Sequence, residues 1–533
     1  MSNLLRKLFY CATATRRKNA SQLYIRSIAS VNKESVQMLD QRVTRLQRSG
    51  ETFGQPTPFT HPHLLQKGEL IQGITAEEIQ GRRNRLMENI QKYDYNLHKK
   101  YSTHLIVIPS ASKKYMSDKI PYVFRQNSDF LYFTGCQEPE SVLVLYIDAN
   151  QNSKSILFVR PKDKHSELWD GPRTGVENAT NLFLVDEAFS VSDFSKVIPK
   201  FGRIDFLWYD NKCDQPTITE QINSIVSRTS AKLTEALTLF IHKQRVIKSE
   251  SEIKLMRKTC EIASEAINKT IRTSKPGDSE HHIFATVDYH CRMNGASYLA
   301  YPPVVASGSN ATTIHYINNS QIVNPMDLVL MDAGCEYGGY TSDITRTWPI
   351  SGSFTQPQLV LYEIIHTVQK ELISKTKNIL KVSKFIFLKS QMFLDTLLRE
   401  GGFTLDSLFD TMCLQLGSYL QEIGLIQKGL VGMDLAKAAY SYCPHHVSHY
   451  LGMDVHDTST VSRSVHLQPG MVCTVEPGIY ISRDRKDVPE EFRGIGIRIE
   501  DDVLVTSDNN IEVLTKACVK DPTLLTQQIR SSN

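Results

Sequence analysis

The sequence predicts a mixed α/β (α+β) protein with two folded domains, and three observations support this prediction. The chain has 533 residues, which is more than one compact core usually accommodates. Short apolar runs alternate with helical patterns between residues 75 and 239, which is typical of an α/β domain. A second, strongly capped helix pattern begins near residue 249, which indicates that a new domain starts there.

The first 33 residues differ in composition from the rest of the chain. They contain seven basic residues and no Asp or Glu, and the first acidic residue is Glu34. This pattern is typical of a mitochondrial presequence, and a disordered basic tail is the alternative. No unbroken apolar segment follows the first charges, so a secretory signal is not indicated. We therefore expect a presequence over 1–33 and a mitochondrial location, with the cytoplasm as a second location.

We expect the N-terminal domain to span residues 74–243, after a linker or surface arm over 34–73. Thr75 and Glu78 have the spacing of a capping box, which predicts a helix from there to about Tyr95. Apolar runs predict three strands of this domain, at 105–108, 141–147 and 155–159.

We expect the C-terminal domain to span 244–520, with a tail over 521–533. Ser249 and Glu252 form a second capping-box pattern at its first helix. Apolar residues spaced by three and four then make one buried stripe: Ile253, Met256, Cys260, Ala263, Ile267 and Ile271. A Lys-Pro-Gly-Asp sequence at 275–278 ends this helix.

Composition gives no support for binding to nucleic acids or for a membrane span. The net charge is only +4, and the acid-free N-terminal segment accounts for much of the basic excess. No stretch of about eighteen apolar residues occurs, so no transmembrane helix is expected. The ten cysteines include no CxxC pair, which favours reduced, buried thiols over disulfides or a zinc knuckle.

Two aspartates flank a predicted β-hairpin in the C-terminal domain. An apolar strand over 328–331 and a second strand over 341–348 surround a Gly-Gly turn. In a hairpin centred near residues 337–338, Asp332 faces Asp343 on one face of the sheet. Two carboxylates so close repel each other unless one is protonated or a cation lies between them. A metal site is one interpretation, and two exposed aspartates at strand ends is the other.

The segment 445–457 reads HHVSHYLGMDVHD and contains four histidines. Histidine is a common nitrogen ligand for metals and carries protons near neutral pH. The pattern is not HExxH, so the helical zinc site of the zincins is not the simple interpretation. A half-buried histidine cluster without a catalytic role is the alternative. The spacing alone does not choose one ligand among the four histidines.

Two glutamates follow β-prone runs further along the chain. Pro-Gly follows Glu476 and ends its strand. Arg498 and Glu500 are two residues apart, so they share one face of a strand. Each glutamate alone also fits a solvated side chain or a salt bridge. Taken together, four carboxylates and one histidine suit two hard-to-borderline cations such as Mn²⁺.

Four segments of the C-terminal domain together resemble one enzyme family: DAGCEYGGYTSDITRTWP, HHVSHYLGMDVHD, TVEPGIY and RGIGIRIEDD. They are similar to the aminopeptidase P branch of the pita-bread metallopeptidases (peptidase family M24B), a group that also includes prolidase and methionine aminopeptidase. FRQNSDFLYFTGCQEPESVLVL and ELWDGPRTG resemble the creatinase-like N-terminal domain of these enzymes. The resemblance covers roughly residues 55–520. It implies a creatinase-like α/β domain, a pita-bread catalytic domain and a homodimer.

The resemblance implies a dinuclear metal site. Its five ligands would be, in chain order, Asp332, Asp343, His449, Glu476 and Glu500. They would hold two divalent ions, expected to be Mn²⁺, with Asp343 and Glu500 as bridges. A hydroxide bridging the two ions would then attack the peptide carbonyl.

The resemblance also assigns roles to residues around the metals. Glu476 would take a proton and deliver it to the leaving proline nitrogen. His456 would bind the carbonyl and stabilise the oxyanion. His445 and His315 would shape the proline side of the site, and Arg498 would orient a carboxylate ligand.

The implied function is release of the N-terminal residue from peptides with an Xaa-Pro N terminus. A prolidase, which cuts only Xaa-Pro dipeptides, would use the same five ligands and is one alternative. A metal-free pita-bread binding module is an alternative from a different class, although such relatives typically lack one or more of the ligands. Cleavage of longer peptides and metal analysis distinguish these possibilities.

Residues 378–400 depart from the pattern of the family. They form an apolar and basic insert without a family counterpart, either a surface helix or a translated intron or alternative exon. All of the expected ligand residues lie outside this insert.

Overall fold

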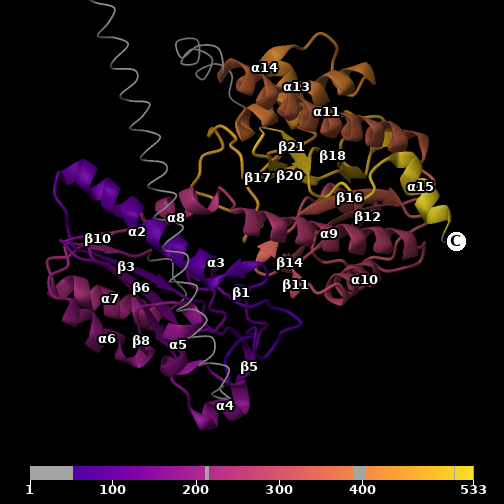
Figure 1. The fold of residues 1–533 in the computed structure, drawn as a ribbon. Coiled ribbons are helices and arrows are strands. Elements are labelled where there is room, and N and C mark those ends of the chain that lie inside the picture. The colour runs from indigo at the N-terminus through magenta and orange to yellow at the C-terminus, as the bar shows by residue number, and fades with distance from the viewer. Residues whose placement is uncertain (1–51, 211–214, 388–402, 509, 532–533) are drawn as a thin grey trace, which may run out of the picture.

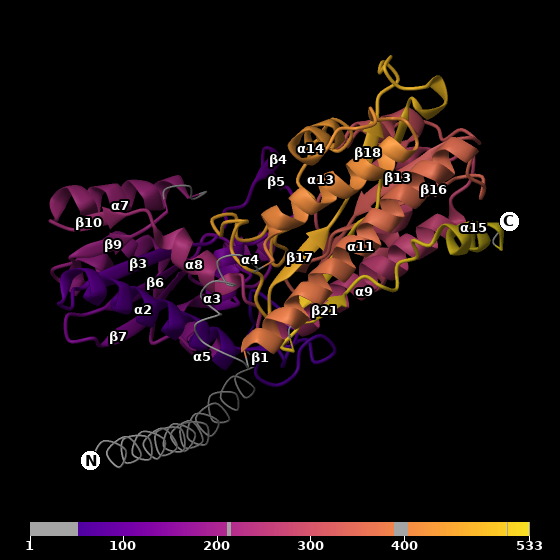
Figure 2. The same ribbon diagram turned by 90° about the horizontal axis from the view of Figure 1, so that it is seen from above.

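The computed structural model describes residues 52–210, 215–387, 403–508 and 510–531 of the chain. Its elements form two lobes that meet at helices α8 (Leu237–Arg245) and α9 (Glu250–Thr273) (Figure 1). Seen from above, the two lobes lie side by side (Figure 2). Both combine strands and helices, which confirms the predicted mixed α/β class. The expected presequence over 1–33 lies outside the described residues.

The N-terminal lobe is built on a mixed six-stranded sheet with the order β10-β9-β3-β6-β7-β8. The predicted strands at 105–108, 141–147 and 155–159 correspond to β3, β6 and β7, with ends that agree within two residues. The strands of this lobe are β1 (Glu69–Ile71), β2 (Ile74–Thr75), β3 (His104–Pro109), β4 (Tyr115–Ser117), β5 (Ile120–Pro121), β6 (Val142–Ile147), β7 (Ser153–Val159), β8 (Glu187–Ser190), β9 (Phe206–Trp208) and β10 (Lys232–Thr234).

Helix α2 begins where the sequence predicts, after Thr75. The Thr75 hydroxyl accepts a 3.3 Å hydrogen bond from the backbone of Glu78 and caps the helix. The reciprocal half of the predicted capping box does not form, because the Glu78 carboxylate accepts hydrogen bonds from Arg82 and Ser249 instead, each at 2.8 Å. The helices of the lobe are α2 (Ala76–His98), α3 (Ser128–Thr134), α4 (Lys164–Asp170), α5 (Gly175–Phe183), α6 (Phe194–Val197), α7 (Pro216–Arg228) and α8.

The described part of the C-terminal lobe contains three three-stranded sheets, β11-β14-β15, β12-β13-β16 and β17-β20-β21, and the two-stranded sheet β18-β19. Its strands are β11 (Tyr298–Leu299), β12 (Val304–Ser307), β13 (Leu328–Ala333), β14 (Cys335–Tyr337), β15 (Tyr340–Thr341), β16 (Ile344–Pro349), β17 (Val472–Val475), β18 (Gly478–Ile481), β19 (Ile495–Arg498), β20 (Asp501–Val505) and β21 (Ile511–Val513). Its helices are α9, α10 (Glu280–Met293), α11 (Gln356–Phe387), α13 (Leu405–Glu422), α14 (Gly432–Tyr440) and α15 (Pro522–Arg530). In Figure 1, α9 and α10 lie below β12 and β16, and α11, α13 and α14 lie above β18 and β20.

Helix α9 forms as the sequence predicts. Ser249 and Glu252 make both hydrogen bonds of the capping box, at 2.9 Å and 3.3 Å. The six residues of the predicted apolar stripe are all buried. The helix ends at Thr273, just before the Lys-Pro-Gly-Asp sequence. Local pattern therefore determines this helix from its start to its end.

The structure describes the first part of the 378–400 insert and most of the C-terminal segment 521–533. Helix α11 continues into the insert, so residues 378–387 are helical, whereas 388–400 lie outside the described residues. The segment 521–533, expected as a tail, contains helix α15. Its Leu525 and Ile529 are fully buried in the core of the C-terminal lobe.

One apolar cluster crosses the boundary between the lobes. It joins Leu86 and Leu143 of the N-terminal lobe to Met256 and Leu451 of the C-terminal lobe. Burial of apolar surface shared by two lobes holds them together. The eight cysteines among the described residues are free and buried, as predicted. None of the described helices has the length and apolar character needed to cross a membrane.

Candidate active site

A β-hairpin of the C-terminal lobe supplies the first two acidic residues of the site. Asp332 lies near the end of β13, and Asp343 directly precedes β16. The strand register pairs Asp332 with Thr345, so the predicted pairing with Asp343 is wrong by two residues. The reason is the turn, whose two glycines have positive φ and lie one residue later than the sequence-based centre.

The two aspartates nevertheless meet at the hydroxyl of Tyr301. That oxygen lies 2.5 Å from Oδ1 of Asp332 and 2.5 Å from Oδ1 of Asp343. A phenol carries one proton and can donate it to only one carboxylate at a time. The other contact brings two oxygen atoms together, a crowding that a cation between the carboxylates would relieve.

Two glutamates reach the same place from another sheet. Glu476 directly follows β17, and Glu500 directly precedes β20. These strands pair antiparallel with Val475 opposite Asp501, so the neighbouring glutamates lie at the same end of the sheet. Strand order therefore brings together two carboxylates that are distant in sequence.

Arg498 and Glu500 share a partner, although the chain between them is not a strand. The Thr345 hydroxyl donates a 2.6 Å hydrogen bond to Oε2 of Glu500 and accepts a 3.0 Å hydrogen bond from Nε of Arg498. Nη2 of Arg498 also lies 2.5 Å from Oδ2 of Asp332. Arg498 thus contacts one of the predicted ligands and is linked to a second through a threonine.

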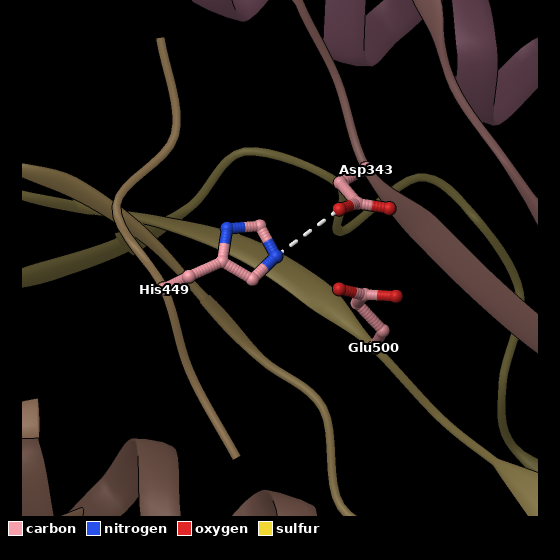
Figure 3. A group of neighbouring side chains, drawn as sticks. All are labelled: Asp343, His449 and Glu500. Carbon is pink, nitrogen blue, oxygen red and sulfur yellow. Dashed lines mark ion pairs between the residues drawn. The ribbon is translucent and has the colours of Figure 1, made fainter. Parts of the chain in front are cut away.

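His449 completes the cluster. Its Nε2 lies 3.3 Å from Oδ2 of Asp343 and 3.5 Å from Oε1 of Glu476. One side-chain ligand atom from each of Asp343, His449 and Glu500 lies within 4.8 Å of the others, and Figure 3 shows the three side chains pointing toward one another. Asp332 joins them through the shared phenol. The structure therefore brings the five predicted ligand residues to one place.

Burial and mutual repulsion make this cluster unfavourable as a set of free anions. Burial raises the pKa of Glu500 well above its usual range, and the charges of Asp343 and Glu476 raise it further. Burial also raises the pKa of Glu476 to about 7. Burial alone would lower the pKa of His449, but its hydrogen bond to Asp343 and the charge of Glu476 raise it to about 9. Cations at the centre would stabilise the ionised carboxylates.

The residues present fit divalent metal ions. Carboxylate oxygens and one imidazole nitrogen form a donor set that hard-to-borderline cations prefer. The oxygen–oxygen contact at Tyr301 and the raised pKa of Glu500 are both consequences of placing carboxylates together, and both would be relieved by positive charge.

A cavity of about 800 Å³ lies beside the cluster, and His449 and Glu476 form part of its wall. The other predicted histidines, His315, His445 and His456, line the same cavity. The ring centroids of His456 and His449 lie 4.5 Å apart. All of the predicted catalytic histidines therefore face one space next to the carboxylates.

The structure distinguishes the four histidines of the segment 445–457, which their spacing in the sequence does not. Nε2 of His445 lies 2.9 Å from the Tyr480 hydroxyl, which accepts a 2.9 Å hydrogen bond from Nη1 of Arg498. Burial lowers the pKa of His445 to about 4, so it is neutral at neutral pH. His446 instead stacks on Phe409, with ring centroids 4.9 Å apart. Of the four, only His449 makes an ion pair with Asp343 among the described contacts.

Sequence reasoning did not identify Tyr301, Thr345 or Tyr480 as site residues. Thr345 had a usable signal, because it lies two residues after Asp343 on a strand and so shares its face. Tyr301 and Tyr480 had no local signal. Their partners lie far away in the sequence, and only the fold brings them together.

Two family models match the chain. The model described as metallopeptidase family M24 matches residues 254–507, and the model described as aminopeptidase P, N-terminal domain, matches residues 79–204. Xaa-Pro aminopeptidase 3 of Homo sapiens is 41% identical over 477 residues, which cover 88% of this chain and 89% of that protein. The mitochondrial intermediate cleaving peptidase 55 of Arabidopsis thaliana is 37% identical, covering 88% of this chain and 86% of that protein.

Solved structures agree with these matches. Aminopeptidase P from Escherichia coli with the inhibitor Pro-Leu has a TM-score of 0.74 and 32% sequence identity, covering 86% of this chain and 99% of that one. The matches extend over both lobes and confirm the predicted combination of an aminopeptidase P N-terminal domain with a pita-bread catalytic domain. Membership of M24 implies divalent metal ions. The chain therefore belongs to the Xaa-Pro aminopeptidase family of M24 metallopeptidases and is a hydrolase of the aminopeptidase type.

Proposed function

We propose that this protein releases the N-terminal residue from peptides with proline at the second position, using two divalent ions, expected to be Mn²⁺. The observation that carries the proposal is the convergence of Asp343, His449 and Glu500 within 4.8 Å, beside a cavity lined by further histidines. The names of the relatives, Xaa-Pro aminopeptidase and aminopeptidase P, support the preference for proline.

Five residues would hold the metal ions: Asp332, Asp343, His449, Glu476 and Glu500. Asp343 suits a bridging position because its two oxygens face different partners, Tyr301 on one side and His449 on the other. Glu500 would be the second bridge, oriented by Thr345. When bound, two divalent ions supply Lewis acidity that activates a water nucleophile and polarises the substrate carbonyl.

Glu476 would move the proton. Of the four carboxylates, it is the one that also lines the cavity, so it can reach both the cluster and a substrate. Its Oε1 accepts a 3.1 Å hydrogen bond from Thr474, and its Oε2 lies 3.8 Å from Nδ1 of His445. A carboxylate held between the two can accept a proton from the nucleophile and give it to the leaving proline nitrogen.

The histidines of the cavity would recognise the scissile bond. His456 would donate a hydrogen bond to the carbonyl oxygen that precedes proline and stabilise the charge that develops there. His445, held by Tyr480, and His315 would border the proline ring. Arg498 would hold Asp332 and Tyr480 in place through the hydrogen bonds that its guanidinium donates to both.

The relatives support an aminopeptidase over a prolidase, because they are named Xaa-Pro aminopeptidase and aminopeptidase P. The cavity beside the cluster is also lined by Asp406, His446 and Arg463. A metal-free binding module is less well supported, because all five donor side chains are present and converge.

We also propose a mitochondrial location and a homodimer. The acid-free basic segment over 1–33 supports import, and the Arabidopsis thaliana relative is itself named mitochondrial. Imported proteins with Xaa-Pro N termini would then be natural substrates. The homodimer follows from the family resemblance, and light scattering of the purified protein tests it.

The decisive experiment compares three peptide sets after chelation of the enzyme and titration with Mn²⁺. Xaa-Pro-Yaa tripeptides should release one residue in a metal-dependent manner, and matched Xaa-Ala-Yaa tripeptides should not. Cleavage confined to Xaa-Pro dipeptides would favour a prolidase. A protein that binds no metal and cleaves none of the peptides would favour the binding module.

A further inference from the structure

At the boundary between the lobes, a buried guanidinium contacts both sides of the turn that carries His456. Arg245, the last residue of α8, is 3% exposed. Its Nη2 lies 2.9 Å from Oδ2 of Asp454 and 2.5 Å from Oδ1 of Asp457. Its Nη1 lies 2.5 Å from Oδ1 of Asp129 on α3. One side chain thus connects the N-terminal lobe to residues that flank the histidine.

A second guanidinium holds the same turn. Nη2 of Arg125 donates a 2.7 Å hydrogen bond to the carbonyl of Met453 and lies 3.2 Å from Oδ1 of Asp454. Its Nε lies 2.7 Å from Oε2 of Glu336. The Ser128 hydroxyl donates a 2.6 Å hydrogen bond to Oδ1 of Asp454. Arg125 and Ser128 therefore contact one oxygen of Asp454, and Arg245 of α8 contacts the other.

The turn is also closed upon itself. Asp457 is 3% exposed, and its Oδ2 lies 3.1 Å from Nζ of Lys248. Its backbone N–H donates a 2.9 Å hydrogen bond to the carbonyl of Tyr450. A Cβ on Gly452 would lie 2.4 Å from Oδ2 of Asp457, so the two segments of the turn touch. These contacts within the turn add to those that Arg245 and Arg125 make with it.

We propose that Arg245 and Arg125 are positioning residues for His456, so that the N-terminal lobe takes part in catalysis by fixing the 450–457 turn. The inference rests on the role proposed above for His456. The side chain of His456 is exposed to the cavity, so its place depends on the backbone that carries it. Misplacement of a catalytic group by about 1 Å can cost up to about 100-fold in rate.

Two substitutions and one control test this role. Arg245→Lys keeps the charge, but a single ammonium cannot span Asp129 and the two aspartates of the turn as a planar fork does. Arg125→Gln removes the second guanidinium. Arg257→Gln is the matched control, because it breaks an exposed 2.7 Å ion pair with Glu512 that lies wholly within the C-terminal lobe. Each variant is made alone and combined with His456→Ala in the full-length protein.

The readouts are kcat and KM on an Xaa-Pro tripeptide, metal content and the thermal midpoint. We expect Arg245→Lys and Arg125→Gln to lower kcat about tenfold or more, with KM nearly unchanged, because His456 acts on the transition state. In the His456→Ala background neither should lower kcat further, since the residue they position is gone. The control should leave kcat unchanged in both backgrounds.

Other results overturn the inference or the role on which it rests. An unchanged kcat, or an equal loss with and without His456, shows that the two arginines do not act through this histidine. If His456→Ala alone retains full kcat, the role proposed for His456 fails, and the inference fails with it. If Arg245→Lys does not fold, Arg125→Gln decides the question, because its side chain is 39% exposed and its loss leaves the buried Arg245 in place.

Discussion

The hydroxyl of Thr345 lies 2.6 Å from Oε2 of Glu500, so a side chain on β16 orients a carboxylate that precedes β20. The same hydroxyl accepts a hydrogen bond from Arg498. We predict that Thr345→Val, which removes the hydroxyl at nearly constant volume, weakens Mn²⁺ binding about 10–100-fold, because partners of metal ligands fix their orientation. Isothermal titration with Mn²⁺ measures the effect.

Thr347→Val is the matched control for this prediction. Thr347 is also buried on β16, but its hydroxyl contacts the backbone N–H and carbonyl of Arg498. It should cost stability and leave the affinity for Mn²⁺ nearly unchanged. An equal loss of affinity in both variants would show that Thr345 has no special part in orienting Glu500.

His456→Ala should separate catalysis from metal binding. We expect both metal ions to remain and kcat to fall about 10²–10³-fold, the usual consequence of removing one donor to a developing oxyanion. Metal analysis and steady-state kinetics on the same preparation check this. Loss of metal in parallel with activity would assign His456 to the metal site instead.

Glu280 should support the loop that carries His315. It is fully buried at the start of α10, and its two oxygens accept hydrogen bonds of 2.8–3.0 Å from one segment, 307–321: Ser307, Asn310, Tyr316 and Gln321. Glu280→Gln places an amide donor against these donors. We predict a loss of about 1–3 kcal/mol in the free energy of unfolding, measured with urea, and a lower kcat/KM.

Tyr316→Phe provides the graded comparison for that variant. It removes a single 2.9 Å hydrogen bond to Glu280, so it should cost about 0.5–1.5 kcal/mol and always less than Glu280→Gln in the same measurement. A Glu280→Gln variant as stable as the Tyr316→Phe variant would contradict the idea that this carboxylate organises the whole loop.

His366 should make stability depend on pH. Burial and the charges of Lys370 and Lys520 lower its pKa from 6.5 to about 4. The unfolded chain therefore binds more protons than the folded chain between these two pH values. The contribution of His366 to the free energy of unfolding is complete above pH 6.5 and is lost as the pH falls to about 4. His366→Gln should flatten this slope in urea unfolding measured across the range. His281→Gln, on the exposed surface of α10, should leave the slope as it is.

The helix and strand patterns of this chain could be predicted where the cause is local. Ser249, Glu252 and the apolar stripe of α9 lie within one helix, so propensity and periodicity are sufficient. The hairpin register could not be fixed to the residue, because either of two adjacent turn centres satisfied the sequence around the glycines. A slip of two residues keeps a side chain on the same face. Asp332 and Asp343 therefore still converge.

The surroundings of the site depend on contacts that no local pattern encodes. Thr345 and Glu500 are 155 residues apart, and Arg498 and Asp332 are 166 apart. The choice of His449 among four neighbouring histidines depends on where β16 places Asp343. Family resemblance supplied that choice in advance, and the fold gives its physical reason.

The central claim is that the carboxylate cluster holds the metal ions on which activity depends, and Asp343→Ala tests it most directly. Metal content by mass spectrometry and activity on an Xaa-Pro tripeptide are measured for the wild-type and variant proteins, with circular dichroism and the thermal midpoint as checks of folding. We expect two Mn²⁺ ions per active wild-type chain and a folded variant that has lost both metal and activity. Full activity in a folded Asp343→Ala protein would contradict it.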